Sequence, residues 1–542
     1  MLRKYLLYYA FTSASLLFTS CMDNFLERNP YGALDETTFF TEEEHANLGV
    51  MACYAKLQRS NDHWAYAQLE LGMTGDLSSS GFKDAQQFYG ATFNPNESNI
   101  VRGIWHRCYE GIAVCNLNLA GISGMSDQII SAAKRDKYLA EIRFIRAFWY
   151  FRLIQFYGDV PMHSVSVDDP TDAPQVQLAA TPKEEILKNM IIPDLDFATK
   201  KLPDSWDEKY LHRVTKGTAF AYLSEVYLYM KDYENALKAG LEVEKYGYEL
   251  LDDPGRVLRV DEEDSKEIIF SVAIADGINQ YRRELYFGSK EDLGGDLGQL
   301  MRGDTYSGDY FYPSKDFIDF FQVIDGKSIT EKSPYYDPQK AWKYRDPRFD
   351  ATFFTEMDVI TTTKGKVMNW QNEWLVNKPT GYDIQKRGVW YGEDSWSQRV
   401  DIHFMRLPRV YLHIAEAYAL KAQPDYEKCN KYVEKVRSRA RRFALTNKDK
   451  YVPKGMKDSQ VLPPFTINSK ESAMAAINYE SRVEFFTEDC IRYFDLKRWG
   501  MLAEEWSRVG GFTWDDKFFD LPYPAAELSA NPQLKQHPGW GN

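Results

Sequence analysis

Residues that form disulfides or bind metals are scarce in this sequence. Six cysteines and eight histidines occur among 542 residues, and neither Cys-x-x-Cys nor His-Glu-x-x-His is present. Familiar zinc sites and disulfide scaffolds depend on such spacings. The sequence therefore predicts no metal site and no cofactor.

Recognisable catalytic patterns are missing as well. Gly326-Lys327-Ser328 ends like a phosphate-binding loop, but Phe321 stands where that loop requires a glycine, so a plain turn is expected. Acidic residues near the C-terminus could be read as catalytic carboxylates, namely Glu480, Glu484, Glu488 and Asp495. Acids at such spacings, interleaved with arginines, are typical of a salt-bridged helix surface. We predict no catalytic residues and no enzymatic activity.

An excess of positive charge is also absent. The 66 Lys and Arg residues are outnumbered by 79 Asp and Glu residues, which gives a formal net charge of −13. Because nucleic-acid-binding proteins present basic surfaces, nucleic acid is excluded as a partner. Aromatic residues are abundant instead, at 15% of the chain, and clusters of rings in polar, glycine-rich segments favour ligand binding.

The first twenty residues resemble a targeting segment. Two cations precede a mostly apolar run that ends at Ser20-Cys21, and this run is too short and too rich in Ser and Thr to span a membrane permanently. A small residue directly before a cysteine resembles a bacterial lipobox. We expect a signal peptide over residues 1–20, a lipid on Cys21 and a tether over residues 21–40, anchored by two acyl chains. An ordinary secretory peptide with an incidental cysteine is the alternative.

The remaining cysteines are odd in number once Cys21 is assigned to lipid, so they cannot form a complete set of disulfides. Each stands in an apolar, helical-looking stretch. We expect buried free thiols at Cys53, Cys108, Cys115, Cys429 and Cys490.

Helical periodicity divides the chain into parts. It covers residues 41–250 and returns within residues 401–542, whereas residues 251–400 are irregular. Within the first part, residues 213–246 predict two helices around Lys231-Asp232, with small residues facing large ones as in tetratricopeptide-like hairpins. A second hairpin of this kind is expected over residues 412–440. We predict a mainly α fold, a tetratricopeptide-like helical-hairpin scaffold with irregular loop-rich insertions.

Four stretches of sequence resemble the SusD/RagB family. They are Trp105-x3-Tyr109-x2-Ile112-x3-Asn116; residues 141–151 running on to 156–161; Glu480-Ser481-Arg482-x-Glu484-Phe485 with residues 492–499; and Leu521-Pro522-Tyr523-Pro524 followed by Asn531-Pro532-x-Leu534. Their order and spacing agree with the family from the lipobox to the last residues. Within the second stretch, Phe144, Phe148 and Phe151 form a stripe expected in the core. Glu141 and Arg146 lie on other faces, where ion pairs between helices are expected.

The resemblance implies a function outside the cell. Members of this family lie as a lid over a SusC-like TonB-dependent transporter of the outer membrane. We therefore expect an outer-membrane, lipid-anchored protein, exposed at the cell surface, that captures oligosaccharides and delivers them to such a transporter. A peptide-binding member of the family is one alternative, and a lipid-anchored helical scaffold or adhesin without a transport role is another.

Three loop segments combine aromatic rings with amides, acids and glycines: residues 64–90, 281–312 and 370–391. Sugar rings stack on aromatic faces, and their hydroxyls bond to Asp, Asn, Gln and Arg. The ligand residues of the family come from variable loops that correspond to these segments. We predict ligand contacts among Trp64, Asp76, Phe88, Tyr89, Tyr281, Tyr306, Tyr310, Trp370, Trp374 and Trp390. Core packing is the alternative for each ring.

Overall fold

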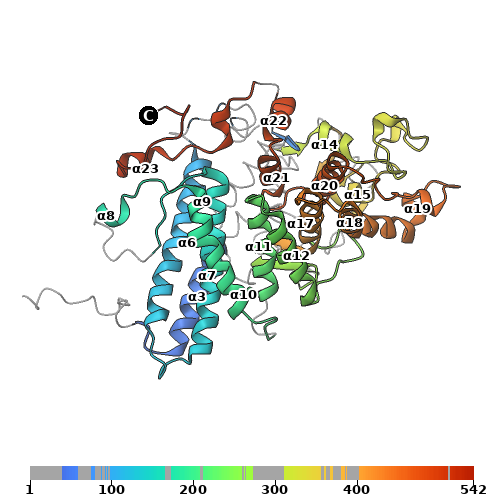
Figure 1. Ribbon diagram of the computed structural model, residues 1–542. Coiled ribbons are helices and arrows are strands. Elements are labelled where there is room, and N and C mark those ends of the chain that lie inside the picture. The colour runs from blue at the N-terminus through green and yellow to red at the C-terminus, as the bar shows by residue number, and fades with distance from the viewer. Residues whose placement is uncertain are drawn as a thin grey trace, which may run out of the picture.

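The computed structural model shows a mainly helical protein (Figure 1). The residues it describes are 39–58, 75–79, 87, 92, 94, 98–164, 173–207, 212–258, 262, 264–272, 311–355, 359–361, 367–369, 380–384, 386, 402–510 and 513–541. In these ranges, no helix has the length and apolar character needed to cross a membrane. The predicted fold class is confirmed.

Long helices lie side by side in the first half of the chain (Figure 1). They are α3 (Glu43–Gln58), α6 (Asn99–Gly124), α7 (Ala132–Tyr157) and α10 (Ile192–Lys201), the last of which directly follows the short α9 (Lys183–Ile186) and the π-helical turn η1 (Leu187–Ile191). The short α8 (Ala173–Val176) lies apart from this group. Helix α7 is buried on every face from Phe144 to its end, because apolar side chains surround it there. It forms the centre around which the other helices pack.

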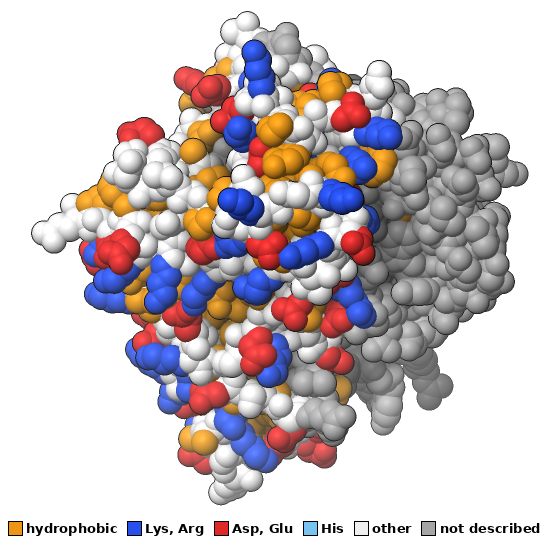
Figure 2. Space-filling view, turned by 90° about the vertical axis from the view of Figure 1, so that its right-hand side faces the viewer, with side chains coloured by type: hydrophobic (Ala, Val, Ile, Leu, Met, Phe, Trp, Pro, Cys, Tyr) orange, Lys and Arg blue, Asp and Glu red, His pale blue; other side chains and the backbone are white. Residues whose placement is uncertain are grey.

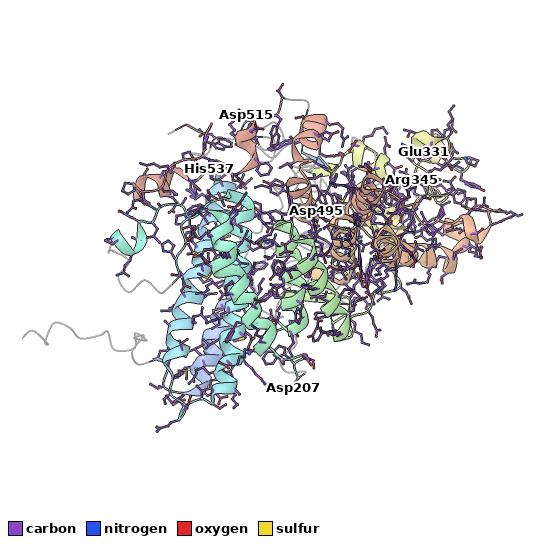
Figure 3. The ribbon with its side chains drawn as sticks, in the orientation of Figure 1. Asp207, Glu331, Arg345, Asp495, Asp515 and His537 are labelled. Atoms are coloured by element: carbon purple, nitrogen blue, oxygen red, sulfur yellow. The ribbon has the colours of Figure 1, made fainter. Side chains whose placement is uncertain are left out.

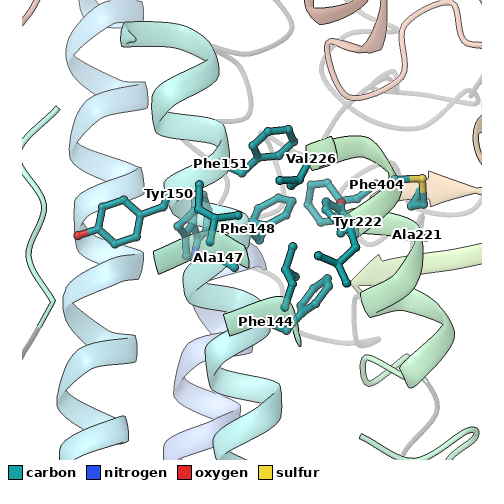
Figure 4. Packing of buried hydrophobic residues seen from close by; sticks show 14 of the residues in the cluster. Phe144, Ala147, Phe148, Tyr150, Phe151, Ala221, Tyr222, Val226 and Phe404 are labelled. Carbon is teal, nitrogen blue, oxygen red and sulfur yellow. The ribbon is translucent and has the colours of Figure 1, made fainter. Parts of the chain in front are cut away.

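The predicted phenylalanine stripe on α7 is confirmed (Figure 4). Phe148 packs edge-to-face on Tyr222 and Phe404 with ring centroids 5.8 and 5.1 Å apart. Both residues on the other faces form ion pairs, and the pair of Arg146 joins two helices, as predicted. Glu141 pairs with Arg213, and Arg146 pairs with Asp194.

Both predicted hairpins are present. Helices α11 (Lys216–Tyr229) and α12 (Tyr233–Val243) form the first, and α17 (Leu407–Leu420) and α18 (Tyr426–Thr446) form the second. The hairpins pack on each other through α12 and α17, where Gly240 lies so close to Ile414 that an added Cβ would approach its Cγ1 to 2.6 Å. A small residue at this position allows the close approach of two helices.

The remaining helices lie after the hairpins or in the irregular segment. They are α14 (Lys315–Phe320), α15 (Arg348–Thr352), α19 (Lys448–Tyr451), α20 (Lys470–Glu484), α21 (Ile491–Trp499), α22 (Leu502–Gly510) and α23 (Ala525–Ala530). Short 3-10 turns are η3 (Glu244–Tyr246), η6 (Ile329–Glu331), η7 (Pro338–Lys340), η9 (Asp458–Gln460) and η10 (Asp516–Phe519). The stretch around Gly326, expected to be a turn, is one: Gly326 has φ 80° and donates its N–H to Val323.

The described strands form four antiparallel pairs. They are β1 (Leu77–Ser79) with β3 (Phe311–Pro313), β2 (Ile268–Val272) with β8 (Ile402–Arg406), β4 (Phe353–Phe354) with β7 (Asp383–Ile384), and β5 (Val359–Thr361) with β6 (Val367–Asn369). Each pair is short. The strands therefore attach segments to the helical scaffold without forming a sheet layer of their own.

The C-terminal tail returns to the first helices. The N–H of Leu521 donates to the carbonyl of Phe156 at 2.8 Å, and the ring of Tyr523 lies edge-to-face on Trp105 at 5.3 Å. Helix α23 consequently lies beside α6 and α8 (Figure 1). The tail thus packs on the helices of the first half of the chain.

All five described cysteines are buried and form no disulfide, as predicted. Figure 2 shows the face at the right of Figure 1, where Lys and Arg side chains alternate with Asp and Glu over the described part. This face carries no field of a single sign.

Candidate functional site

Most of the predicted ligand residues lie outside the described residues. These are Trp64, Phe88, Tyr89, Tyr281, Tyr306, Tyr310, Trp370, Trp374 and Trp390, together with the predicted lipid attachment residue Cys21. Their contacts remain predictions. The structure does describe the strands that border or lie within all three loop segments.

Strands from the three loop segments lie together. In the first segment, β1 pairs with β3 at the end of the second segment, and Ser78 stands opposite Tyr312. In the third segment, β7 contacts β3 and pairs with β4, with Ile384 opposite Phe353. Segments far apart in the sequence therefore meet at one place, which we call the three-loop region. Loops that meet on a rigid scaffold are the usual location of binding sites.

A cluster of phenylalanines supports the three-loop region from below. Phe317 on α14 stacks on Phe486 with ring centroids 4.4 Å apart, and Phe353 on β4 packs edge-to-face on Phe317 and Phe321 at 5.6 and 5.5 Å. Ile384 on β7 belongs to the same buried cluster. Close packing of these rings fixes the strands from which the loop segments extend.

Asp76 is the one predicted ligand residue that the described part of the chain contains. Only 3% of its surface is exposed, and its Oδ1 accepts hydrogen bonds from Nε and Nη2 of Arg482 at 2.8 and 2.6 Å. Burial raises the pKa of Asp76 even though Arg482 opposes the rise. This geometry gives Asp76 a structural role beneath the three-loop region, and it lends no support to the predicted ligand contact.

Arg482 joins the first loop segment to α14 through two acids. Its Nη2 also donates to Oδ2 of Asp316 on α14 at 2.8 Å, and Arg508 on α22 pairs with the same carboxylate. Burial alone would raise the pKa of Asp316, but the two arginines outweigh it and lower the pKa. One guanidinium therefore holds β1 and α14 in place at once.

The acids near the C-terminus are salt-bridged as predicted, but they are buried, so their predicted place on a helix surface is wrong. Glu480, Glu484, Glu488 and Asp495 are all at most 3% exposed, and Asp495 lies in the interior between helices (Figure 3). Their arginine partners come mainly from other elements, which sequence spacing cannot reveal. The partners are Arg348 and Arg437 for Glu480, Arg406 and Arg439 for Glu484, Arg406 and Lys386 for Glu488, and Arg409 and Arg498 for Asp495.

This buried ion network is structural in its chemistry. Arg406 donates to Glu488 from Nε at 2.7 Å and from Nη2 at 2.8 Å, and its Nη1 donates to Glu267 at 2.5 Å. Burial would raise the pKa of Glu484, but Arg439, Arg406 and Arg348 outweigh it and lower the pKa. The carboxylate of Glu484 is thus held ionised, and all four carboxylates are buried and already accept hydrogen bonds from basic side chains, which is the geometry of structural ion pairs. The network links β8, α18 and α20 to the irregular segment.

A pocket of about 540 Å³ lies away from the three-loop region. Helix α6, the segment after α7, α8 and the tail around α23 form its walls, and we call it the α6–tail pocket. Sequence reasoning missed it. Trp105, Tyr109, Ile112 and Asn116 recur on one face of α6, and the sequence alone shows this pattern only as a resemblance to the family. The residues that form the walls are far apart in the sequence, and only the fold brings them together. Local sequence patterns therefore give no signal of the pocket.

The described residues offer no site for a metal ion, since no three of their His, Cys, Asp or Glu side chains are grouped suitably.

The described residues define a tetratricopeptide-like helical scaffold that carries a loop region assembled from three segments. Sequence comparison identifies the family of this chain. The SusD family matches residues 266–540, and a family described as "Starch-binding associating with outer membrane" matches residues 24–228. The chain belongs to the SusD family.

Curated relatives carry the same family name. SusD-like protein P25 of Formosa agariphila is 21% identical over 96% of this chain and 96% of its own length. SusD-like protein P2 of the same organism is 28% identical, but over 42% of this chain. The chain spans 44% of the length of P2 and 39% of that of a SusD-like protein from Bacteroides ovatus.

Solved structures share the fold. A SusD-like protein from Bacteroides fragilis superposes with a TM-score of 0.74 at 22% identity, covering 94% of this chain and all of that one. A laminarin-binding SusD-like protein gives 0.67 at 22% identity, and surface glycan-binding protein A from Bacteroides thetaiotaomicron gives 0.65 at 19% identity; each covers 92% of this chain and 100% of the other. At these identities the likeness establishes the fold.

Proposed function

We propose that this protein is a cell-surface lipoprotein of the outer membrane that captures oligosaccharides and delivers them to a SusC-like TonB-dependent transporter. The observation that carries the proposal is the three-loop region. Strands of three aromatic-rich segments meet there on a rigid base, in a family in which proteins of the same fold are named for glycan binding.

The chemistry of the loop segments fits a sugar ligand. They combine tryptophan and tyrosine rings with asparagine, glutamine and aspartate, so flat ring faces and hydrogen-bonding side chains stand close in sequence. Oligosaccharides need both, because their C–H faces stack on rings and their hydroxyls require partners. Fixing the strands that border the loops lowers the entropy lost on binding. A binding role without catalysis agrees with the names of the similar proteins, which describe binding.

The proposal is tested with the mature protein and a panel of laminari-, malto- and xylo-oligosaccharides. Calorimetry should detect binding of at least one of them, and chromatography after long incubation should recover the bound sugar unchanged. Absence of binding across a wide glycan array, together with binding of a peptide library, would favour peptide as the cargo. Release of shorter sugars by protein free of contaminating hydrolase would contradict the binding role.

Delivery to a transporter is tested separately in membranes. Detergent extracts of cells that express the protein should yield a complex with a TonB-dependent transporter, and deletion of that transporter should abolish growth on the bound glycan while leaving purified-protein affinity unchanged. Growth that persists without the transporter would contradict the delivery step.

A further inference from the structure

The walls of the α6–tail pocket are mainly apolar. Trp105, Tyr109 and Leu117 line it from α6, and Val176 and Leu534 line it from α8 and the tail. Its volume of about 540 Å³ falls within the range of pockets that hold small organic ligands, roughly 300–1,000 Å³. The pocket is therefore large enough for a ring-sized ligand.

The amide and phenol groups in these walls already donate within the protein. The donors and their carbonyl acceptors are Tyr109 Oη to Pro161 (2.7 Å), Asn116 Nδ2 to His163 (2.9 Å), Gln177 Nε2 to Ala530 (2.9 Å) and Asn531 Nδ2 to Leu178 (2.7 Å). Arg146 in turn donates to Oδ1 of Asn116 at 2.9 Å. A sugar would bring many hydroxyls that need partners, and this wall has little capacity left for them. The pocket is chemically unlike the loop segments.

One charge is present in the pocket wall. Among the described lining residues, and with histidine counted as neutral at pH 7, Glu527 on α23 carries the only formal charge. Burial lowers the pKa of His163, which keeps that imidazole neutral at neutral pH. A single carboxylate beside indole and phenol rings favours a cation, because the carboxylate attracts it and the ring faces tolerate it.

We propose that the α6–tail pocket binds an organic amine: an apolar ring or branched chain seats between α6 and the tail, and the attached ammonium group pairs with Glu527. The N-terminal residue of a hydrophobic peptide has this chemistry, as does a free aromatic amine. This ligand class is distinct from the glycan of the proposed function and does not depend on it.

The charge requirement is tested with 2-phenylethylamine and its neutral analogue 2-phenylethanol, by calorimetry or saturation-transfer NMR on the mature protein. The amine should bind about 3–10 times more tightly than the alcohol, the ratio expected for one partly exposed ion pair. Glu527→Gln should remove this difference. Glu504→Gln, at an exposed glutamate on α22 outside the pocket, should preserve it. Equal affinities of amine and alcohol for the unaltered protein would overturn the proposal.

The location is tested with bulk at two alanines on the same face of α6. Ala113 lines the pocket, whereas Ala120 lies two turns further along, is exposed and does not line it. Ala113→Trp should abolish amine binding, and Ala120→Trp should leave it unchanged. Binding that survives Ala113→Trp would overturn the proposal, as would displacement of the amine by an oligosaccharide that the protein binds. Glycan affinity that Ala113→Trp leaves intact would separate this site from the three-loop region.

Discussion

Arg482 on α20 donates two hydrogen bonds to Oδ1 of Asp76, although the two residues are 406 positions apart in the chain. The pair is buried, and Asp316 accepts a third bond from the same guanidinium. Strand β1 and helix α14 thus depend on one side chain near the end of the chain. The arrangement holds the first loop segment beside α14, which closely follows the second loop segment in the sequence.

Replacing Arg482 with Met should leave the carboxylate of Asp76 buried without its partner. We expect the free energy of unfolding to fall by about 3–5 kcal/mol, as for other buried ion pairs that lose one member. Urea unfolding at pH 7 measures the loss. The double variant Asp76→Leu with Arg482→Met removes both charges and should recover part of it. A single variant as stable as the unaltered protein would contradict the structural role of the pair.

Glu141 provides a pH-dependent contribution to stability. Burial raises the pKa of this carboxyl from 4.5 to about 7, although Arg213 and the hydroxyl of Tyr54 oppose the rise. The folded state therefore binds a proton more tightly than the unfolded state. The stability contributed by this site is fully present below pH 4.5 and is lost as the pH rises through 7.

Replacing Glu141 with Gln, which resembles the protonated acid, should remove this dependence. At pH 8 we expect the variant to exceed the unaltered protein in stability by up to about 3 kcal/mol, since each pKa unit corresponds to about 1.4 kcal/mol. Chemical unfolding at pH 5 and pH 8 measures the difference. Glu185→Gln, at an exposed position on α9, should leave the pH profile unchanged. Parallel profiles for Glu141→Gln and the unaltered protein would refute the assignment.

Local patterns in the sequence predict the scaffold well. Small residues facing large ones predict the α11–α12 and α17–α18 hairpins, and the stripe of Phe144, Phe148 and Phe151 predicts the core, because these signals arise from residues three or four apart. The buried thiols are predicted for the same reason. Such features require no knowledge of which helix packs on which.

Long-range pairing is what the sequence does not reveal. The local sequence around Glu484 and Glu488 is compatible with an exposed helix surface. Their burial is evident only in the structure, where Arg406 on β8 and Arg439 on α18 pair with them. Asp76 belongs to an aromatic-rich loop segment by position, yet its carboxylate points to Arg482. The nine remaining ligand residues lie outside the described ranges, so their contacts rest on the family resemblance and on the strands beside them.

Cys21 should carry lipid and form the mature N-terminus. The expectation rests on the basic–apolar–cysteine order at the start of the chain. Palmitate with a radioactive label, supplied to growing cells, should enter the unaltered protein and should not enter a Cys21→Ala variant. The variant should also be lost from the outer-membrane fraction, because two acyl chains supply stable anchoring. Equal labelling of both proteins would favour an ordinary secretory signal.

Different aromatic rings should contribute to the stability of the protein and to its affinity for glycan. Phe148 is buried against Tyr222 and Phe404, so Phe148→Ala should create a cavity and cost about 3–5 kcal/mol of stability. Any loss of glycan binding in this variant should follow from unfolding. Trp370, Trp374 and Trp390 belong to the third loop segment, where polar and glycine residues replace a core stripe.

At least one of these three tryptophans should stack on the sugar. Its replacement with Ala should weaken glycan binding by about 1–3 kcal/mol while leaving the melting temperature nearly unchanged, since an aromatic anchor contributes to the complex and not to the core. Calorimetry with the bound oligosaccharide, run beside thermal melts of all four variants, separates the two kinds of ring. Three tryptophan variants that melt as low as Phe148→Ala would place those rings in the core. Three that keep both stability and affinity would move the sugar contacts to the first and second loop segments, where Phe88, Tyr89, Tyr281, Tyr306 and Tyr310 become the residues to replace.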